Sequence, residues 1–318
     1  MPVDSKSRMN VDPFPELRTA QELADINRFI LVPVPDETGI AGLVRLVVER
    51  ATGRRWFAKA AAVKFDPANE VIGARLAEAI TAQLATATGH SRPRGGLLKP
   101  RAAFVCGRQD LVLIQHVVDH PNQGELLAAG VDIAGEPTLF GPDEAALGRL
   151  VTDLADPLCL VSELLFAFLV DNDDGGNDRN WLVLSVAGRQ PLKQVVVIDL
   201  GFALLGRGPE ELGAAGYEEL LSERLRVDLP SYLRQWTAPV SLWAMLRQAV
   251  SSGLVTAEEL AGTYDRFVVA ASPALGTLEL GDVDPVHASR VRRLTTARLA
   301  LLKQERDAYL IVLSGASP

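Results

Sequence analysis

The stretch Leu169-Val-Asp-Asn-Asp-Asp-Gly-Gly-Asn-Asp-Arg-Asn-Trp-Leu-Val183, followed by Val195-Val-Val-Ile-Asp-Leu-Gly-Phe-Ala-Leu204, is the most informative part of this chain. It gathers carboxylates and Asn side chains in one polar loop, crosses a short hairpin, and then presents a single Asp at the end of an apolar strand. Magnesium and calcium take such oxygen ligands in proteins. The stretch therefore predicts a cation site where the loop meets the end of the strand.

A calcium-binding loop is an alternative interpretation of the same residues. With Asp171 as position 1, acidic groups stand at positions 1 and 3 and Gly176 stands at position 6, as such loops require. However, Leu182 replaces the bidentate Glu of position 12, and Gly175 occupies position 5. The count of oxygen ligands therefore argues against calcium.

The composition is that of a globular protein. The chain has 318 residues, of which 48% are hydrophobic and 23% charged, enough for one large domain or two lobes. Its net charge of -8 gives no electrostatic footprint for nucleic acid, so we expect none to be bound directly by this chain. Its two Cys, Cys106 and Cys159, argue against a disulfide framework and a structural zinc site.

The N-terminal residues favour a soluble, cytoplasmic protein. Residues 1–20 contain Pro13 and Pro15 and few apolar positions, which predicts a flexible tail without the apolar core of a signal peptide. Because no apolar run approaches the roughly 20 residues that span a bilayer, we expect no membrane contact.

Residues 21–118 are predicted to form a first, strand-rich lobe with one helix. The helix is indicated by Ile72, Leu76, Ile80 and Leu84, which follow helical spacing after Pro67. The five expected strands are residues 29–34, 43–49, 55–60, 102–106 and 111–118, with a turn at 107–110 between the last two.

Residues 119–318 are predicted to form a second, helical lobe. Helices are expected at about 143–153 and 158–170, and a two-stranded hairpin at 181–186 and 195–199. Beyond Gly208 the pattern is helical, with interruptions expected at Pro230, Pro239 and the stretch 272–285. A strand-rich lobe joined to a helical lobe is an α+β architecture.

Two charged residues of the first lobe have the spacing of a phosphate-binding pair. Lys59 lies on the third predicted strand, and Glu70 opens the next helix eleven positions later, where its carboxylate can pair with Lys59. Lys64 is a competing choice, but it follows the strand and precedes Glu70 by only six positions. Lys59 and Glu70 are therefore the candidates for a lysine that neutralises phosphates and a carboxylate that orients it.

The polar loop supplies candidates for the magnesium ligands and for a carboxylate near an attacking hydroxyl. Asp199 ends its strand and is followed by Leu-Gly-Phe, like the D-F-G element that holds magnesium in kinases, and Asn180 precedes it by nineteen positions. The kinase spacing D-x-x-x-x-N requires Asp at position 175, which is Gly175. Asp174 is the best choice if the loop has one inserted residue, with Asp173 and Asp178 as rivals.

Taken together, these motifs resemble the HipA-like kinase family, which is related in core fold to phosphatidylinositol kinases and protein kinases. The resemblance covers roughly residues 30–205 and implies a two-lobed protein-kinase-like fold that binds ATP and magnesium and transfers the γ-phosphate to a Ser or Thr of a protein. The motifs that carry it are Trp56-Phe-Ala-Lys59, Asn69-Glu70, the loop ending in Asn180-Trp-Leu-Val183, and Ile198-Asp-Leu-Gly-Phe-Ala203.

The resemblance assigns roles residue by residue. It implies that Lys59 contacts the ATP phosphates, that Glu70 orients Lys59, that Asn180 and Asp199 bind magnesium, and that Asp174 is the catalytic carboxylate. It implies a phosphate loop at Thr38-Gly-Ile-Ala-Gly42, in which Gly39 and Gly42 approach the nucleotide and Thr38 is the candidate for regulatory phosphorylation. It also implies an adenine-binding hinge at Ile114-Gln-His-Val117, formed by the backbone of Gln115, His116 and Val117.

The loop departs from the family pattern. The order D-R-H is absent, because Asp178-Arg179 is followed directly by Asn180, and Val183 stands where a later Asn is expected. Either an insertion has shifted the loop or the activity is altered. A catalytically weak protein that binds nucleotide or a partner, and a lipid or small-molecule kinase, are therefore the alternatives to a protein kinase. For the kinase we expect a protein substrate with a Ser or Thr acceptor. A cognate regulatory protein is a further candidate partner.

Basic residues near the C-terminus suggest an anionic partner at first sight. The helical spacing of Val291, Leu294 and Leu301 instead predicts an amphipathic helix whose basic residues form a solvated face. The basic residues concerned are Arg290, Arg292, Arg293 and Arg298.

Overall fold

The computed structural model describes most of the predicted elements. The expected tail at residues 1–20 lies outside the described residues, so its conformation stays a prediction. The described residues are 29–31, 44–49, 55–60, 66–90, 93–99, 102–105, 108–115, 144–172, 181–185, 193–197, 200, 203–204, 214–236 and 241–315.

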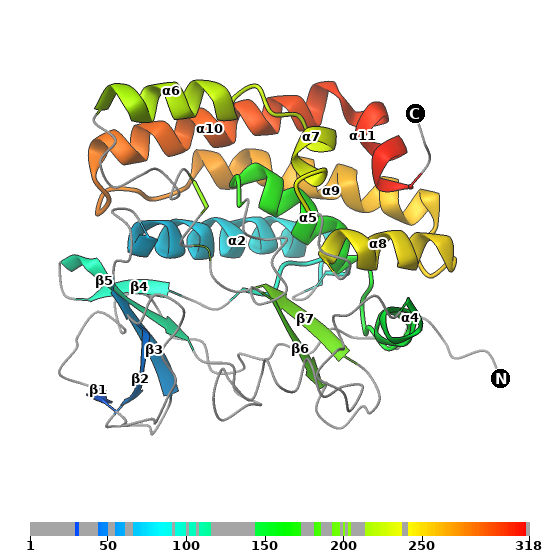
Figure 1. Cartoon of the computed structure of the whole chain (residues 1–318), viewed down its shortest axis with the longest axis horizontal. Coiled ribbons are helices and arrows are strands. Elements are labelled where there is room, and N and C mark those ends of the chain that lie inside the picture. Colours follow the sequence, from blue (N-terminus) through cyan, green and yellow to red (C-terminus); the bar gives the residue numbers. More distant parts are fainter. Residues whose placement is uncertain are drawn as a thin grey trace.

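Among the described residues, five strands form one antiparallel sheet in the order β1-β2-β3-β5-β4 (Figure 1). The central strand β3 carries Lys59, which lies opposite Val44 of β2 and Val112 of β5. The turn expected at 107–110 is shorter than predicted, because Arg108 already pairs with Val105. The strands are β1 (Phe29–Leu31), β2 (Val44–Glu49), β3 (Arg55–Ala60), β4 (Ala102–Val105) and β5 (Arg108–Gln115).

Helix α2 (Asp66–Thr88) lies between this sheet and the helical part of the molecule (Figure 1). It contacts β4 and β5 on one side and α9 (Ala257–Gly276) on the other. Its apolar side chains Ile72, Leu76 and Ile80 are fully buried, as their spacing predicted. Because both sides of the helix are covered, its position is set by the sheet and by the helices together.

The helical part is built around α5 (Cys159–Leu169), in which every residue is buried. It contacts α8, α9, α10 and strand β7, so it is the centre of the core. Its predicted range, 158–170, is confirmed. The other elements are α4 (Glu144–Thr152), β6 (Trp181–Ser185), β7 (Lys193–Val197), α6 (Ala214–Arg224), α7 (Leu229–Leu233), α8 (Leu242–Ser251), α10 (Pro285–Gln304) and α11 (Arg306–Leu313).

Prolines interrupt the helices less than the sequence predicted. Pro230 lies in the first turn of α7 and Pro285 begins α10, positions where the missing N–H costs nothing. Pro273 lies inside α9, which continues to Gly276, so the interruption expected over 272–285 is present but begins later than predicted, at residue 277. The neighbours Ala271 and Ala274 are buried against the core, and this packing holds the last turn in place. No helix within the described ranges has the length and apolarity needed to cross a membrane.

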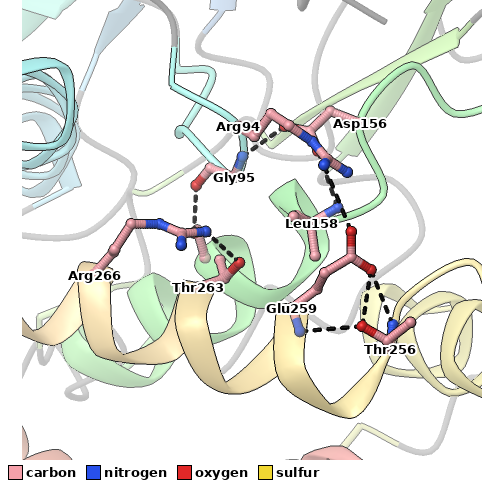
Figure 2. Close-up of polar contacts among 9 residues, drawn as sticks. Arg94, Gly95, Asp156, Leu158, Thr256, Glu259, Thr263 and Arg266 are labelled. Atoms are coloured by element: carbon pink, nitrogen blue, oxygen red, sulfur yellow. Dashed lines mark hydrogen bonds and ion pairs between the residues drawn. The ribbon is translucent and has the colours of Figure 1, made fainter. Parts of the chain in front are cut away.

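The segment after α2 is anchored to α5 and α9 (Figure 2). The backbone N–H of Gly95 donates to Oδ2 of Asp156 at 2.6 Å, and the hydroxyl of Ser162 donates to the Gly95 carbonyl. Arg94 lies 3.5 Å from Oε1 of Glu259 in the first turn of α9. Gly95 has a positive φ of 74°, a conformation that favours glycine.

Helix α2 is also joined to the segment between α9 and α10. Arg75 donates to both carboxylate oxygens of Asp282, at 2.7 and 2.6 Å, and to the carbonyl of Glu279 at 3.1 Å. Such bidentate pairs fix orientation as well as distance. The middle of α2 is therefore fixed to the segment that directly follows α9, the helix that α2 contacts.

Replacing Gly95 by Ala is expected to destabilise the protein through both backbone and packing. An added Cβ would lie 2.8 Å from Cγ2 of Thr263, whereas at Gly89, with a similar φ of 68°, it would meet nothing within 4 Å. We expect Gly95→Ala to lower the free energy of unfolding by about 1–3 kcal/mol more than Gly89→Ala, as measured by urea denaturation. Equal losses in the two variants would show that the contact at Thr263 is unimportant.

The Arg75–Asp282 pair is expected to contribute stability only when Asp282 is ionised. The hydrogen bond from Arg75 holds the pKa of Asp282 below its ordinary value. Since the folded-state pKa is depressed, the contribution is present above the unfolded pKa of about 3.9 and is lost as the pH falls through the folded pKa. Asp282→Asn should cost at most about 1 kcal/mol at pH 7, because the pair is half-exposed, and progressively less as the pH falls below the unfolded pKa of about 3.9. Thermal unfolding of both proteins at several pH values measures this difference.

Candidate functional site

Lys59 and Glu70 form a buried ion pair between β3 and α2. Nζ of Lys59 lies 2.8 Å from Oε1 of Glu70, and the two residues are 8% and 4% exposed. The predicted pairing of these two side chains is therefore confirmed. The competing Lys64 lies outside the described residues.

The second oxygen of Glu70 extends this contact to Leu200, in the segment that follows β7. Oε2 accepts a hydrogen bond from the backbone N–H of Leu200 at 3.0 Å. A buried carboxylate needs partners for its lone pairs, and here each oxygen has one. Leu200 directly follows Asp199 in the chain. Glu70 therefore joins β3, which carries Lys59, to the segment that follows β7.

The register of the hairpin fixes where the chain enters β6 and leaves β7. Trp181 of β6 pairs with Val197 of β7. Asn180 directly precedes Trp181, and Asp199 follows Val197 by two positions. The register therefore makes the chain enter β6 and leave β7 at the same end, which is also the end that Leu200 attaches to Glu70.

Several predicted site residues lie outside the described residues, and their roles stay predictions. Gln115 is described as the last residue of β5, opposite Trp56 of β3. Within the described part of the chain, no three His, Cys, Asp or Glu side chains are close enough together to hold a metal ion. The residues outside it are Thr38, Gly39, Gly42, His116, Val117, Asp173, Asp174, Asp178, Asn180 and Asp199.

A second buried ion pair lies near Glu70, and the sequence prediction missed it. Lys99, just before β4, contacts Glu163 of α5, and the two side chains are 4% and 1% exposed. Burial lowers the pKa of Lys99, while the negative charges of Glu163 and Glu70 act in the opposite direction. Burial likewise raises the pKa of Glu163, against the effect of Lys99.

The sequence did contain a signal for this pair. Glu163 is the one charged residue of α5, whose other positions are mostly large and apolar. A lone carboxylate in such a helix must have a buried partner. Which cation supplies the partner depends on tertiary packing, because Lys99 is 64 positions away in the chain.

The N-terminal end of α2 is attached to α10 beside Glu70. Nε2 of His287 lies 2.8 Å from Oδ1 of Asn69, and both residues are buried. This contact fits an imidazole that carries its proton on Nε2, since the amide oxygen accepts. The residue next to Glu70 is thereby fixed to the helical part of the molecule.

The predicted solvated face of α10 is wrong at two of its four arginines. Arg292 and Arg293 are exposed, but Arg290 and Arg298 are only 5% and 0% exposed. Arg298 is buried because it packs on Phe168 of α5 and pairs with Asp171. Arg290 is buried because α6 lies alongside α10 (Figure 1). Arg290 lies 4.9 Å from the ring centroid of Tyr217 of α6, and its Nε donates to Glu218 at 3.0 Å. The periodicity of one helix does not show whether a second helix covers its polar face.

Comparisons with known proteins establish the fold of this chain but not its family. No protein-family model matches the chain, and no protein of curated function matches its sequence. Among solved structures, the chain is similar to the crystal structure of a Helicobacter pylori proinflammatory kinase, CtkA, with a TM-score of 0.51. The match covers 91% of this chain and 98% of that one. The chain has a kinase-like fold. At 10% identity the similarity establishes the fold alone and does not single out the HipA-like family.

Removing one partner of the Lys59–Glu70 pair is expected to cost more than removing both. Glu70→Gln leaves the buried Lys59 without its countercharge and should lower the free energy of unfolding by about 3–5 kcal/mol, as should Lys59→Met. The double variant should lose less than the sum of the two single losses, because no buried charge is left uncompensated. Chemical denaturation of all four proteins gives the coupling energy. Additive losses would contradict a direct pair.

Proposed function

We propose that this protein is an ATP- and magnesium-dependent phosphotransferase that transfers the γ-phosphate to a Ser or Thr hydroxyl of a protein. The observation that carries the proposal is the buried chain of contacts from Lys59 through Glu70 to the N–H of Leu200. In a kinase-like fold, this chain connects the strand lysine with the segment that carries the Asp for magnesium.

The proposed roles follow from what phosphoryl transfer requires. The transferred group carries charge on its oxygens and needs neutralisation and alignment more than covalent chemistry. Lys59 would neutralise the phosphates, and Glu70 would keep its ammonium group directed at them. Asn180, which precedes β6 in the chain, and Asp199, which follows β7, would hold magnesium, which would screen the charge between the phosphates. Asp174 would orient the attacking hydroxyl.

The remaining contacts to the nucleotide belong to the proposal as well. Gly39 and Gly42 would let the backbone of the loop before β2 approach the phosphates. The backbone of Gln115, His116 and Val117 would contact adenine. The Ser or Thr acceptor is supported by the resemblance to HipA-like kinases, and with it come a protein substrate and a cognate regulatory protein as partners.

A catalytically weak nucleotide-binding protein is the second candidate function. It is favoured by Gly175, which stands where the kinase spacing requires the catalytic Asp. On this alternative, the Lys59–Glu70 pair would serve nucleotide binding without transfer. A lipid or small-molecule kinase on the same fold would differ only in its acceptor.

ATP binding measured by calorimetry, with and without magnesium, tests the proposal. We expect wild type to bind ATP with magnesium and Asp199→Ala to lose at least about tenfold in affinity, the equivalent of 1.4 kcal/mol. Asp307→Ala, which removes an exposed carboxylate of α11, is the matched control and should bind as wild type does. Absent or magnesium-independent binding in wild type would overturn the kinase proposal.

Transfer of labelled γ-phosphate then separates the two candidate functions. Incorporation into protein Ser or Thr supports the kinase. Retained binding without incorporation into any protein, lipid or small molecule supports the nucleotide-binding alternative.

A further inference from the structure

Backbone strain is concentrated where the polar loop begins. Among the described residues, the two non-glycine residues with positive φ are Asp171, at 52°, and Leu204, at 53°. The N–H of Leu204 donates to the carbonyl of Val170 at 2.7 Å, so both strained residues meet at the C-terminal end of α5. One comes just before the loop 173–180 and the other just after the segment that carries Asp199. Strain of about 1–3 kcal/mol per residue persists only where the surroundings enforce it.

The enforcing group at Asp171 is a fully buried arginine from a distant helix. Nη2 of Arg298, on α10, lies 2.7 Å from Oδ1 of Asp171, and the side chains are 0% and 2% exposed. The other amino group of Arg298 donates to the carbonyl of Val227, and its guanidinium lies 4.4 Å from the ring centroid of Phe168. Arg224 of α6 approaches Oδ2 of Asp171 at 3.5 Å.

The next residue, Asn172, is held by a third helix. The hydroxyl of Tyr232, on α7, donates to the Asn172 carbonyl at 2.6 Å. The N–H of Asn172 donates to the carbonyl of Ala167 at 2.9 Å, which closes the end of α5. Helices α6, α7 and α10 therefore fix the last two described residues before the loop.

Stability alone does not account for this arrangement. Replacing a buried ion pair by apolar side chains is often neutral or stabilising, so a pair of this kind is weak support for a purely structural role. Here the pair also enforces a strained backbone at the entry to the loop that carries Asp174 and Asn180. Observed strain of this kind indicates a functional site.

We propose that Arg298 and Asp171 are positioning residues for phosphoryl transfer, which set the place at which the loop 173–180 leaves α5. The inference rests on the proposed kinase function and extends it to two residues that touch neither nucleotide nor magnesium. Helix α10 then fixes two parts of the proposed site. His287 binds Asn69, which precedes Glu70, and Arg298 binds Asp171, which precedes the loop 173–180 in the chain. The two α10 residues are eleven positions apart, a rise of about 16 Å in a rigid helix.

Two variants test the role, and neither leaves a buried charge without an opposite charge beside it. Arg298→Lys keeps the charge but lacks the planar fork that reaches Asp171 and Val227 together. The double variant Asp171→Asn, Arg298→Met removes both charges. With labelled ATP and magnesium, we expect kcat for phosphate transfer or ATP hydrolysis to fall about 10- to 100-fold in each, since small misplacements of reacting groups have effects of this size. KM for ATP should change less than kcat, because Lys59 and Glu70 are untouched and Asn180 is only one of the two proposed magnesium ligands.

The matched control is Arg306→Met, which removes a bidentate contact of 2.6 and 2.7 Å to Asp265 on the far side of α9. It should leave kcat at the wild-type value. All assays are run below the unfolding midpoint of every variant, as measured by circular dichroism. A lowered midpoint with unchanged kcat in the Arg298 variants would show a merely structural role and overturn the inference.

A second measurement does not depend on activity. Amide hydrogen exchange in peptides covering 171–180 should be at least about tenfold faster in Arg298→Lys than in Arg306→Met or wild type, because local opening is no longer opposed. If wild type neither binds nor turns over ATP, the kinase proposal fails, while this exchange difference still decides whether Arg298 positions the loop. Equal exchange in all three proteins would overturn the inference whatever the activity.

Discussion

The carboxylate of Glu70 joins the parts of the molecule on which the candidate site depends. One oxygen binds Lys59 of β3, and the other accepts from the N–H of Leu200, which follows Asp199. Glu70 thereby joins its own helix to β3, eleven positions earlier in the chain, and to Leu200, 130 positions later. Because the carboxylate is buried, losing any of these contacts leaves a charge or a lone pair unsatisfied. The sheet, α2 and the hairpin therefore have one arrangement in which all of these groups are satisfied.

The surroundings of Glu70 keep that arrangement in place. Helix α2 is covered on both sides and is attached at its N-terminal end by Asn69 to α10, in its middle by Arg75 to the segment before α10, and after its end by Gly95 to α5. The Lys99–Glu163 pair places a further positive charge near Glu70 and joins the segment before β4 to α5. These contacts fix the position of α2 and, with it, of Glu70 beside Lys59.

The strongest local patterns predicted the elements well, and the failures share a physical cause. The helical spacing of Ile72 and Leu76 and the apolar run of α5 located two helices that the structure confirms. The arginines of α10 were misjudged, since Arg298 reaches a buried carboxylate 127 positions away. The interruption expected over 272–285 was predicted to start too early, because packing of the neighbours of Pro273 carries α9 to Gly276. In each case a long-range contact outweighed the local preference.

The spacing of residues in the chain was enough to pair Lys59 with Glu70, because eleven positions connect a strand to the first turn of the next helix and leave little choice of partner. It also placed Asn180 and Asp199 on either side of one hairpin, whose ladder ends at Trp181 and Val197. The contact of Glu70 with Leu200, 130 positions on, and the three helices that hold Asp171 and Asn172 emerged only in the folded chain. Local periodicity reports which face of an element is buried, but the partner that buries it is chosen by the packing of the whole molecule.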